Sequence, residues 1–160
     1  MKEIPLTQGK VVLVDNEDYE MISKHNWSIS HRNYVTRNIF TPMVKGKRKH
    51  WKVYMHRQIM KVNGESIIDH INGNELDNRK TNLRICTQRE NSYNSKISKN
   101  NTSGFKGVTW RKSRKKWVAQ IMYKRKGYGL GYFTDKIEAA KAYNEAAKKY
   151  FGEFAKLNEV

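Results

Sequence analysis

A polar stretch of fourteen residues, "DHINGNELDNRKTN" at 69–82, constrains the fold of this chain more than any other feature. It lies between two short runs, "ESIID" and "LRIC", whose residue types are typical of strands. Thr87 and Glu90 then form a capping-box signature, which predicts that a helix begins after the second strand. The pattern therefore predicts a strand, a loop, a strand and a helix, a ββα unit, over about residues 66–95.

Residue types alone leave three interpretations of the polar stretch open. Asn, Gly and Asp form ordinary turns, but turn formation does not explain an Asp–His pair at the end of an apolar strand. A calcium loop needs acidic ligands at alternating positions, and this stretch has no acid at its third or fifth position. The third interpretation is a nuclease site, where a base activates water and a cation holds the phosphate.

The nuclease interpretation assigns roles to individual side chains. Asp69 and the amide carbonyl of Asn91, on the predicted helix, are oxygen ligands of the kind that Mg²⁺ prefers. Because side chains alternate across a strand, Asp69 and His70 reach one phosphate only if the strand bends at its end. Asn82 is predicted to form hydrogen bonds across the loop and to fix its shape.

The charge of the chain predicts its class of partner. Net charge is +17, from 32 basic and 15 acidic residues, and this excess indicates a polyanion. A membrane surface is the alternative polyanion, but no apolar stretch approaches eighteen residues and no long basic amphipathic helix stands out. Double-stranded DNA is therefore the predicted partner, with no membrane and no small-molecule substrate.

Composition changes near residue 100 and divides the chain into two predicted domains, 1–98 and 99–160. Most of the segment at 91–104, "NSYNSKISKNNTSG", is typical of a linker. The first domain has 17 basic and 10 acidic residues, and the second has 15 and 5. The start of the chain lacks the apolar core of a signal peptide, and the single cysteine, Cys86, forms no internal disulfide. Both features favour the cytoplasm, of a bacterium or of a phage-infected host cell.

Alternating runs predict the remaining elements of an α+β chain. In the first domain, the expected helix is 15–25 and the expected strands of a small sheet are 10–14, 27–30, 33–40 and 50–56. In the second domain, a three-stranded antiparallel sheet is expected from the runs at 104–111, 115–123 and 127–133. A helix should follow, capped by Thr134 or Asp135 and ending at Gly152.

The motif "DHINGN", "DNR", "NLR" and "EN" resembles the HNH homing endonucleases, especially those of phage type, over about residues 50–95. The resemblance implies a ββα-metal fold in which His70 is the general base and Asn82 shapes the loop. It also implies that Asp69 and Asn91 are ligands of a divalent cation, with Mg²⁺ favoured over Mn²⁺. Asp69 stands where His is more common in that family.

A second resemblance covers residues 103–158. The matching segments are "SGFKGVTW", "KKWVAQI", "LGYF", "EAAKAYNEAA" and "FGEFAKLN", which resemble the AP2 DNA-binding domain. That family places a three-stranded sheet in the major groove and supports it with a helix. The chain departs from the plant pattern at Thr109 and Met122, where arginines are usual, so the resemblance does not transfer a base preference.

Predicted DNA contacts combine this resemblance with the clustering of basic residues on the first two strands and their turns. Trp117 is assigned to the core, and His56 to packing or capping. The predicted contacts are Arg57, Arg84, Thr109, Trp110, Arg111, Lys112, Arg114, Lys116, Gln120, Met122, Lys124 and Lys126.

Two hypotheses about function follow from the sequence. The first is a metal-dependent DNA endonuclease of the homing type, targeted to its site by the AP2-like domain. The alternative is a sequence-specific DNA-binding regulator that keeps a vestigial HNH fold and does not cleave. The asymmetric two-domain chain favours a monomer.

Overall fold

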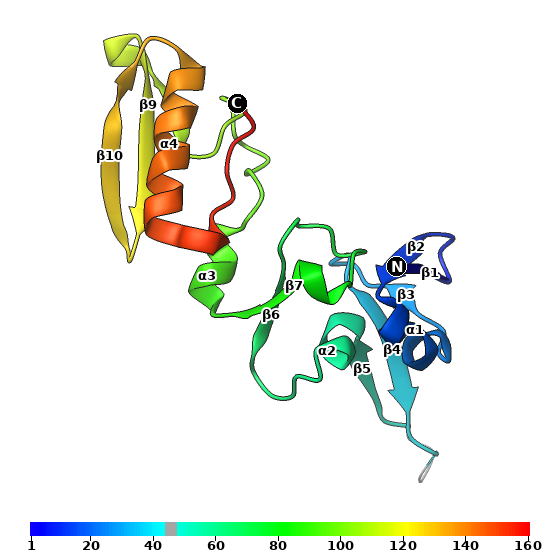
Figure 1. The fold of residues 1–160 in the computed structure, drawn as a ribbon. Coiled ribbons are helices and arrows are strands. Elements are labelled where there is room, and N and C mark those ends of the chain that lie inside the picture. Colours follow the sequence, from blue (N-terminus) through cyan, green and yellow to red (C-terminus); the bar gives the residue numbers. More distant parts are fainter. Residues whose placement is uncertain (44–47) are drawn as a thin grey trace. The chain divides into compact units, whose positions relative to one another are not determined.

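The computed structural model describes residues 1–43 and 48–160. These residues form two compact units, Met1–Gln88 and Arg89–Val160, and each unit has its own apolar core. The division falls before the boundary that composition suggests, and the domain limits of 1–98 and 99–160 stay a prediction. Small antiparallel sheets and a few helices make up the units, which confirms the α+β class (Figure 1).

The first unit contains two small sheets ahead of the ββα segment. The two-stranded sheet pairs β1 (Lys2–Pro5) with β2 (Val11–Val14), and α1 (Asn16–Ser23) follows it. The three-stranded sheet has the order β3 (Ser28–Ile29), β4 (Val35–Phe40) and β5 (His50–Tyr54). Trp27 is fully buried at its centre and donates its indole N–H to the Ile22 carbonyl at 2.8 Å. The sequence analysis did not predict β1.

One predicted strand is partly a helix. The run at 50–56 was expected to be extended throughout, but β5 ends at Tyr54 and α2 (Met55–Ile59) begins at the next residue. Met55 and Ile59 are four residues apart, so a helix turns both of them into the core, where both are buried. His56 therefore lies on a helix, where its ring faces the candidate site.

The ββα segment matches its prediction closely. β6 (Ile67–His70) pairs antiparallel with β7 (Leu83–Cys86), and α3 (Gln88–Tyr93) follows. A short 3-10 helix, Lys80–Asn82, leads into β7. Ile68 and Leu83 are buried in the core of the first unit, which holds the two-stranded ribbon in place.

The second unit is a three-stranded antiparallel sheet with α4 (Lys136–Phe151) against one of its faces (Figure 1). Its strands are β8 (Val108–Arg111), β9 (Lys116–Tyr123) and β10 (Lys126–Phe133), with β9 in the centre. The Asp135 carboxylate caps α4 by accepting a hydrogen bond from the Ile137 N–H at 3.0 Å, as predicted. Ala119, Ala140 and Ala147 are fully buried, because small side chains let the helix lie close to the sheet.

The first strand of this sheet is shorter than predicted. The expected strand began at residue 104, whereas β8 begins at Val108. The Asn101 side chain accepts a hydrogen bond from the Gly104 N–H at 2.7 Å and folds the segment into a turn. Gly107 has a φ of +74°, and an added Cβ would lie 2.1 Å from the Tyr143 ring. The close approach of this loop to α4 therefore requires glycine at position 107, and the strand begins only at Val108.

None of the helices formed by the described residues is long and apolar enough to cross a membrane.

Candidate functional site

Asp69 and His70 end strand β6, and both are buried, at 6% and 4% exposure. Asp69 lies opposite Arg84 in the ladder, and Arg84 contacts its Oδ2 through Nη2 at 2.7 Å and through Nε at 3.0 Å. A guanidinium that donates two hydrogen bonds to one carboxylate oxygen holds that carboxylate in a fixed orientation.

The strand stays regular through His70, which pairs with Leu83. The bend that the sequence analysis required is a turn that begins one residue later, where the Gly73 N–H donates to the His70 carbonyl at 2.8 Å. Gly73 has a φ of +71°, a conformation that glycine adopts at no steric cost. The turn follows both residues and leaves alternation to place Asp69 and His70 on opposite faces of β6, so their contact with one phosphate stays a prediction.

The His70 imidazole lies in a cluster of aromatic rings. His56, from α2, meets it edge to face with the ring centroids 5.3 Å apart. Tyr34, just before β4, lies 6.1 Å from His70 and 5.2 Å from His56. Tyr54, the last residue of β5, lies 5.6 Å from His56. Rings from two segments distant from His70 in sequence, Tyr34 and His56, thus contact its imidazole, and Tyr54 contacts His56 in turn.

Burial lowers the pKa of His70, against the opposing effects of Asn78, Glu75 and Asp69. The nearby Asn78 amide raises the pKa of His70. The Oδ1 of Asn78 is buried and accepts no hydrogen bond from the described residues. Burial also lowers the pKa of His56, to about 3, with His70 and Arg57 adding to the effect. A lowered pKa keeps His70 neutral near pH 7, which is the form that accepts a proton.

The Asn82 side chain forms the hydrogen bonds across the loop that were predicted for it. Its Oδ1 accepts from the Asn72 N–H at 2.9 Å, and its Nδ2 donates to the Asp77 carbonyl at 2.8 Å. The Ile71 N–H also donates to the Asn82 carbonyl at 2.9 Å. Asn82 therefore ties both halves of the loop to the start of β7.

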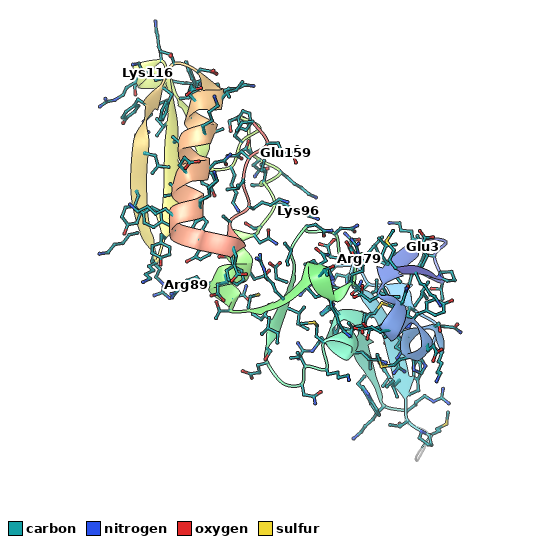
Figure 2. All side chains as sticks on the ribbon, in the orientation of Figure 1. Glu3, Arg79, Arg89, Lys96, Lys116 and Glu159 are labelled. Atoms are coloured by element: carbon teal, nitrogen blue, oxygen red, sulfur yellow. The ribbon has the colours of Figure 1, made fainter. Side chains whose placement is uncertain are left out.

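The other polar residues of the loop are mainly structural. Asn72 and Asn74 accept hydrogen bonds from backbone N–H groups two residues ahead, at 2.8 and 3.1 Å, which are Asx turns. Asp77 pairs with Arg79 at 2.6 Å, and Arg79 is labelled in Figure 2. The Asn78 N–H donates to the Leu13 carbonyl at 2.8 Å, so the loop is docked on β2.

Asn91 lies on α3 and is partly exposed. It belongs to the second compact unit, and its pairing with Asp69 stays a prediction from the sequence. Within residues 1–43 and 48–160, no three His, Cys, Asp or Glu side chains group into a metal cage. Mg²⁺ keeps several waters and takes oxygens from phosphate, so one carboxylate and one amide are a suitable protein contribution.

The two basic residues of the first unit that were predicted to contact DNA already have protein partners. The Arg57 guanidinium donates to the carbonyls of Ser66 and Gly64, both at 2.6 Å, and so holds the loop before β6. Arg84 is paired with Asp69. The structure thus gives both residues a structural role, and their contacts with phosphate stay predictions.

The predicted contacts of the second unit separate by face of the sheet. Thr109 pairs with Val118 and Arg111 with Lys116 in the β8–β9 ladder, so alternation places them with Gln120 and Met122 on the face away from α4. Trp110 lies on the α4 side, where its ring contacts Trp117 at 5.1 Å. Trp110 is therefore on the opposite face from its expected companions.

The remaining predicted contacts lie in the turns at the ends of this sheet. Lys112 and Arg114 are exposed in the turn after β8, and Lys116 lies at that end of the sheet in Figure 2. The Arg114 guanidinium lies 4.6 Å from the Tyr132 ring centroid. Lys124 and Lys126 are exposed in the β9–β10 turn, where Lys124 has a φ of +48°.

Sequence reasoning missed Tyr34 and Asn78 and gave His56 no part in the site. A signal was present for His56, because Met55 and Ile59 beside it are apolar at helical spacing and indicate a helical turn there. No local signal marks Tyr34, because its proximity to His70 comes from the packing of β4 beside α2.

Comparison with known proteins gives two matches to family models. A model described as HNH endonuclease matches residues 53–93, and one described as AP2 domain matches residues 103–153. The HNH match contains Asp69, His70, Asn82 and Asn91. No solved structure matches the chain.

Two curated relatives support the same assignment. Protein 3.8 of Escherichia phage T7 is 36% identical over 90 residues, which cover 56% of this chain and 74% of that protein. An uncharacterized HNH endonuclease of Acanthamoeba polyphaga mimivirus is 26% identical over 163 residues, which cover 96% of this chain and 77% of that protein. The chain belongs to the HNH endonuclease family and carries an AP2 domain in its C-terminal half.

Proposed function

We propose that the protein is a metal-dependent DNA endonuclease of the homing type that cleaves a phosphodiester bond at the end of the β6–β7 ribbon. The observation that carries this proposal is the buried Asp69–His70 pair, beside a loop that Asn82 ties in place. Burying ionisable groups costs stability, so a buried pair that the fold keeps despite this cost supports a reactive site.

His70 is proposed to act as the general base. Its neutral imidazole takes a proton from water, and the water oxygen forms a bond to phosphorus. The bond from phosphorus to the 3′ oxygen breaks, and that oxygen takes a proton from solvent, which leaves a 5′ phosphate and a 3′ hydroxyl. The ring cluster around His70 restricts the imidazole to a narrow range of orientations.

The HNH family generally uses a divalent cation, and the residues present suit a hard one. Asp69 and Asn91 are proposed to hold Mg²⁺, or Mn²⁺ in its place, through carboxylate and amide oxygens. When bound, the cation supplies positive charge for the phosphate and the departing oxygen. Arg84 pairs with Asp69, and its guanidinium is proposed to add a second positive charge beside the same phosphate.

The second unit is proposed to select the target. The sheet face away from α4 carries Thr109, Arg111, Gln120 and Met122, which combine hydrogen-bonding, charged and apolar side chains. A β-sheet face of this kind reads base edges in the major groove, while the basic turns contact phosphates. The asymmetric pair of units favours action as a monomer, which nicks one strand.

Plasmid nicking tests the chemistry. The full-length protein should convert supercoiled plasmid to open circles in Mg²⁺ and not in EDTA. His70→Ala should reduce the rate about 10²–10⁴-fold, the usual cost of a lost general base. His25→Ala is the matched control, because His25 packs on Trp27 in the same unit and should leave the rate unchanged.

Equal rates for His70→Ala and wild type would refute the mechanism. If the wild-type protein binds DNA in a salt-dependent way and does not cut it in Mg²⁺ or Mn²⁺, the chain is instead a DNA-binding regulator with a vestigial HNH fold. Cleavage of a genomic DNA pool followed by end sequencing tests the homing type, which requires a small number of discrete cut sites.

A further inference from the structure

The outer halves of β4 and β5 form a two-stranded ribbon that extends past the rest of the first unit (Figure 1). β3 pairs only with Val35 and Thr36, so from Asn38 onward β4 has β5 as its sole partner in the sheet. Phe40 and Trp51 on this ribbon are 54% and 51% exposed. They lie on opposite faces of the ribbon, so each face exposes one large aromatic side chain.

The ribbon lies in one of the two longest segments of the chain without an acidic residue. No acidic residue occurs between Glu20 and Glu65, whereas ten lysines and arginines do. The described basic residues of the ribbon, Arg48, Lys49 and Lys52, are exposed. This charge is complementary to a polyanion and disfavours a basic partner surface.

One face of the ribbon leads directly to the candidate site. The ladder pairs Thr36 with Tyr54, Asn38 with Lys52 and Phe40 with His50, and alternation places these pairs on the same face. At the inner end of that face, Tyr54 contacts His56, and His56 contacts His70. We call the outer part of this face, formed by Asn38, Phe40, Arg48, His50 and Lys52, the arm face.

Side-chain contacts support a single continuous surface. The Phe40 and His50 rings lie 5.7 Å apart, and the Arg48 guanidinium lies 5.6 Å from the Phe40 centroid. Ile39 and Trp51 pair on the opposite face, with Arg37 and Val53 beside them. At about 3.3 Å per residue, the distance from Tyr54 to His50 is about 13 Å, or about four base pairs of duplex.

We propose that the arm face binds the DNA duplex on one side of the scissile phosphate and guides it to His70. Lys52 and Arg48 contact backbone phosphates, and the Phe40–His50 ring pair packs on deoxyribose. A two-stranded ribbon fits the major groove, so the arm can follow the duplex without distorting it. This inference rests on the proposed function, because it takes His70 as the point of cleavage.

Salt dependence of binding measures the proposed phosphate contacts. The full-length protein is titrated into a fluorescent 40-base-pair duplex of random sequence, in EDTA, at several KCl concentrations. Each lost phosphate contact should reduce the slope of log K against log salt by about 0.9, so Arg48→Ala with Lys52→Ala should reduce it by about 1.8. Between 50 and 200 mM KCl, the affinity of wild type should then fall about 12-fold more than that of the variant.

Matched controls locate the contact on the arm face. Lys10→Ala with Lys24→Ala removes the same charge from the β1–β2 turn and the end of α1, and should leave the slope unchanged. Phe40→Ala should weaken binding, whereas Trp51→Ala on the opposite face should not. If the double variant fails to fold, Lys52→Gln alone should reduce the slope by about 0.9.

The outcomes separate this inference from the proposed function. Equal slopes for the arm variant and the control pair, or a larger loss for Trp51→Ala than for Phe40→Ala, overturn the arm face even if the protein cuts plasmid in Mg²⁺. If the wild type does not cut, the proposed function fails, and the slopes measured in EDTA still decide whether the arm binds DNA.

Discussion

The two units of the protein place their polar residues in opposite ways. The first unit buries ionisable side chains, among them Asp18, His56, Asp69, His70 and Asp77. In the described part of the second unit, the buried polar residues are Asn94, Ser103, Asn144 and Asn158, and no Asp, Glu, His, Lys or Arg is buried. A buried ionisable group costs stability and gains reactivity, whereas an exposed one attracts a charged partner at little cost. The difference agrees with the proposed division, in which the first unit performs the chemistry and the second holds DNA.

The buried asparagines of the second unit serve its packing. Asn144 and Asn158 exchange hydrogen bonds, with the Asn144 Nδ2 donating to the Asn158 carbonyl at 2.9 Å and its Oδ1 accepting from the Asn158 N–H at 2.7 Å. Asn158 also accepts from the Lys106 N–H at 2.7 Å. These bonds fasten the C-terminal segment to α4 and so stabilise the packing of the second unit.

The largest loss of stability is expected from a substitution at Gly107, which should unfold the second unit and leave the first unit folded. In Gly107→Ala, the new Cβ would lie 2.1 Å from the Tyr143 ring and 2.6 Å from the Gln120 carbonyl, at a φ of +74°. We expect a loss of at least about 3 kcal/mol from overpacking and backbone strain together. Hydrogen exchange read by mass spectrometry should show the second unit unfolded and the first protected.

Gly104→Ala is the control for this substitution. Its φ is +81°, but no atom lies within 4 Å of the added Cβ. Only the backbone strain remains, about 1 kcal/mol. Equal losses for the two variants would show that contact with Tyr143 is not what requires glycine at 107.

The next largest loss of stability is expected from a substitution in the polar loop of the first unit. Asn82→Ala removes the side chain that satisfies the Asn72 N–H and the Asp77 carbonyl. Losing both bonds should cost about 2–4 kcal/mol, measured by urea denaturation, and should reduce nicking by displacing the loop next to His70.

The matched control in the same loop is Asn74→Ala. Asn74 is exposed, and among the described contacts its side chain bonds only the Leu76 N–H, so water can replace it. The expected loss is about 0.5–1 kcal/mol. An Asn82→Ala variant with full activity would contradict the role assigned to that residue.

Acid should weaken the first unit before the second. The native pKa of His56 is about 3, against 6.5 for the ordinary side chain. Between these values the unfolded chain binds a proton that the native state does not, so stability is full above pH 6.5 and falls as pH drops toward 3. The melting temperature of the first unit should therefore decrease over this window.

His56→Phe should flatten that decrease, because it removes the titrating group and keeps a ring of similar shape. In the second unit, burial raises the pKa of Tyr143 to about 12, which affects stability only above pH 10. Its melting temperature should therefore show no contribution from Tyr143 between pH 6.5 and 3. An unchanged acid response in His56→Phe would assign the effect to other groups.

The smallest effect is expected on the salt dependence of DNA binding, in a comparison of Arg111 and Trp110, which are neighbours on β8. Arg111→Ala should reduce the salt slope of DNA binding by about 0.9, because its side chain lies on the face away from α4. Trp110→Phe should leave the slope unchanged, since Trp110 packs on Trp117 on the other side of the sheet. Binding to the random-sequence duplex measures the slope for both variants. A reduced slope for Trp110→Phe and an unchanged slope for Arg111→Ala would show that DNA contacts the α4 side of the sheet.

The sequence by itself determined the elements whose signals are local. Strand β7, the cap of α4 at Asp135 and the stop at Gly152 follow from alternation, side-chain capping and the conformational freedom of glycine. Asn82 was also assigned correctly to the shape of the loop, because a loop between two paired strands has to be closed by groups at its ends. The motif that carries Asp69, His70 and Asn91 needed no tertiary information to be recognised.

Only the tertiary structure decided what surrounds His70. Tyr34, His56 and Asn78 come from separate elements, and no local pattern encodes packing between segments that are distant in the chain. The same holds for Arg84, whose partner is set by the register of β6 against β7, and for Trp110, whose face depends on the ladder of β8 with β9. A one-residue shift in either register would turn these side chains to the opposite face, so sequence periodicity can locate a strand without fixing what its residues touch.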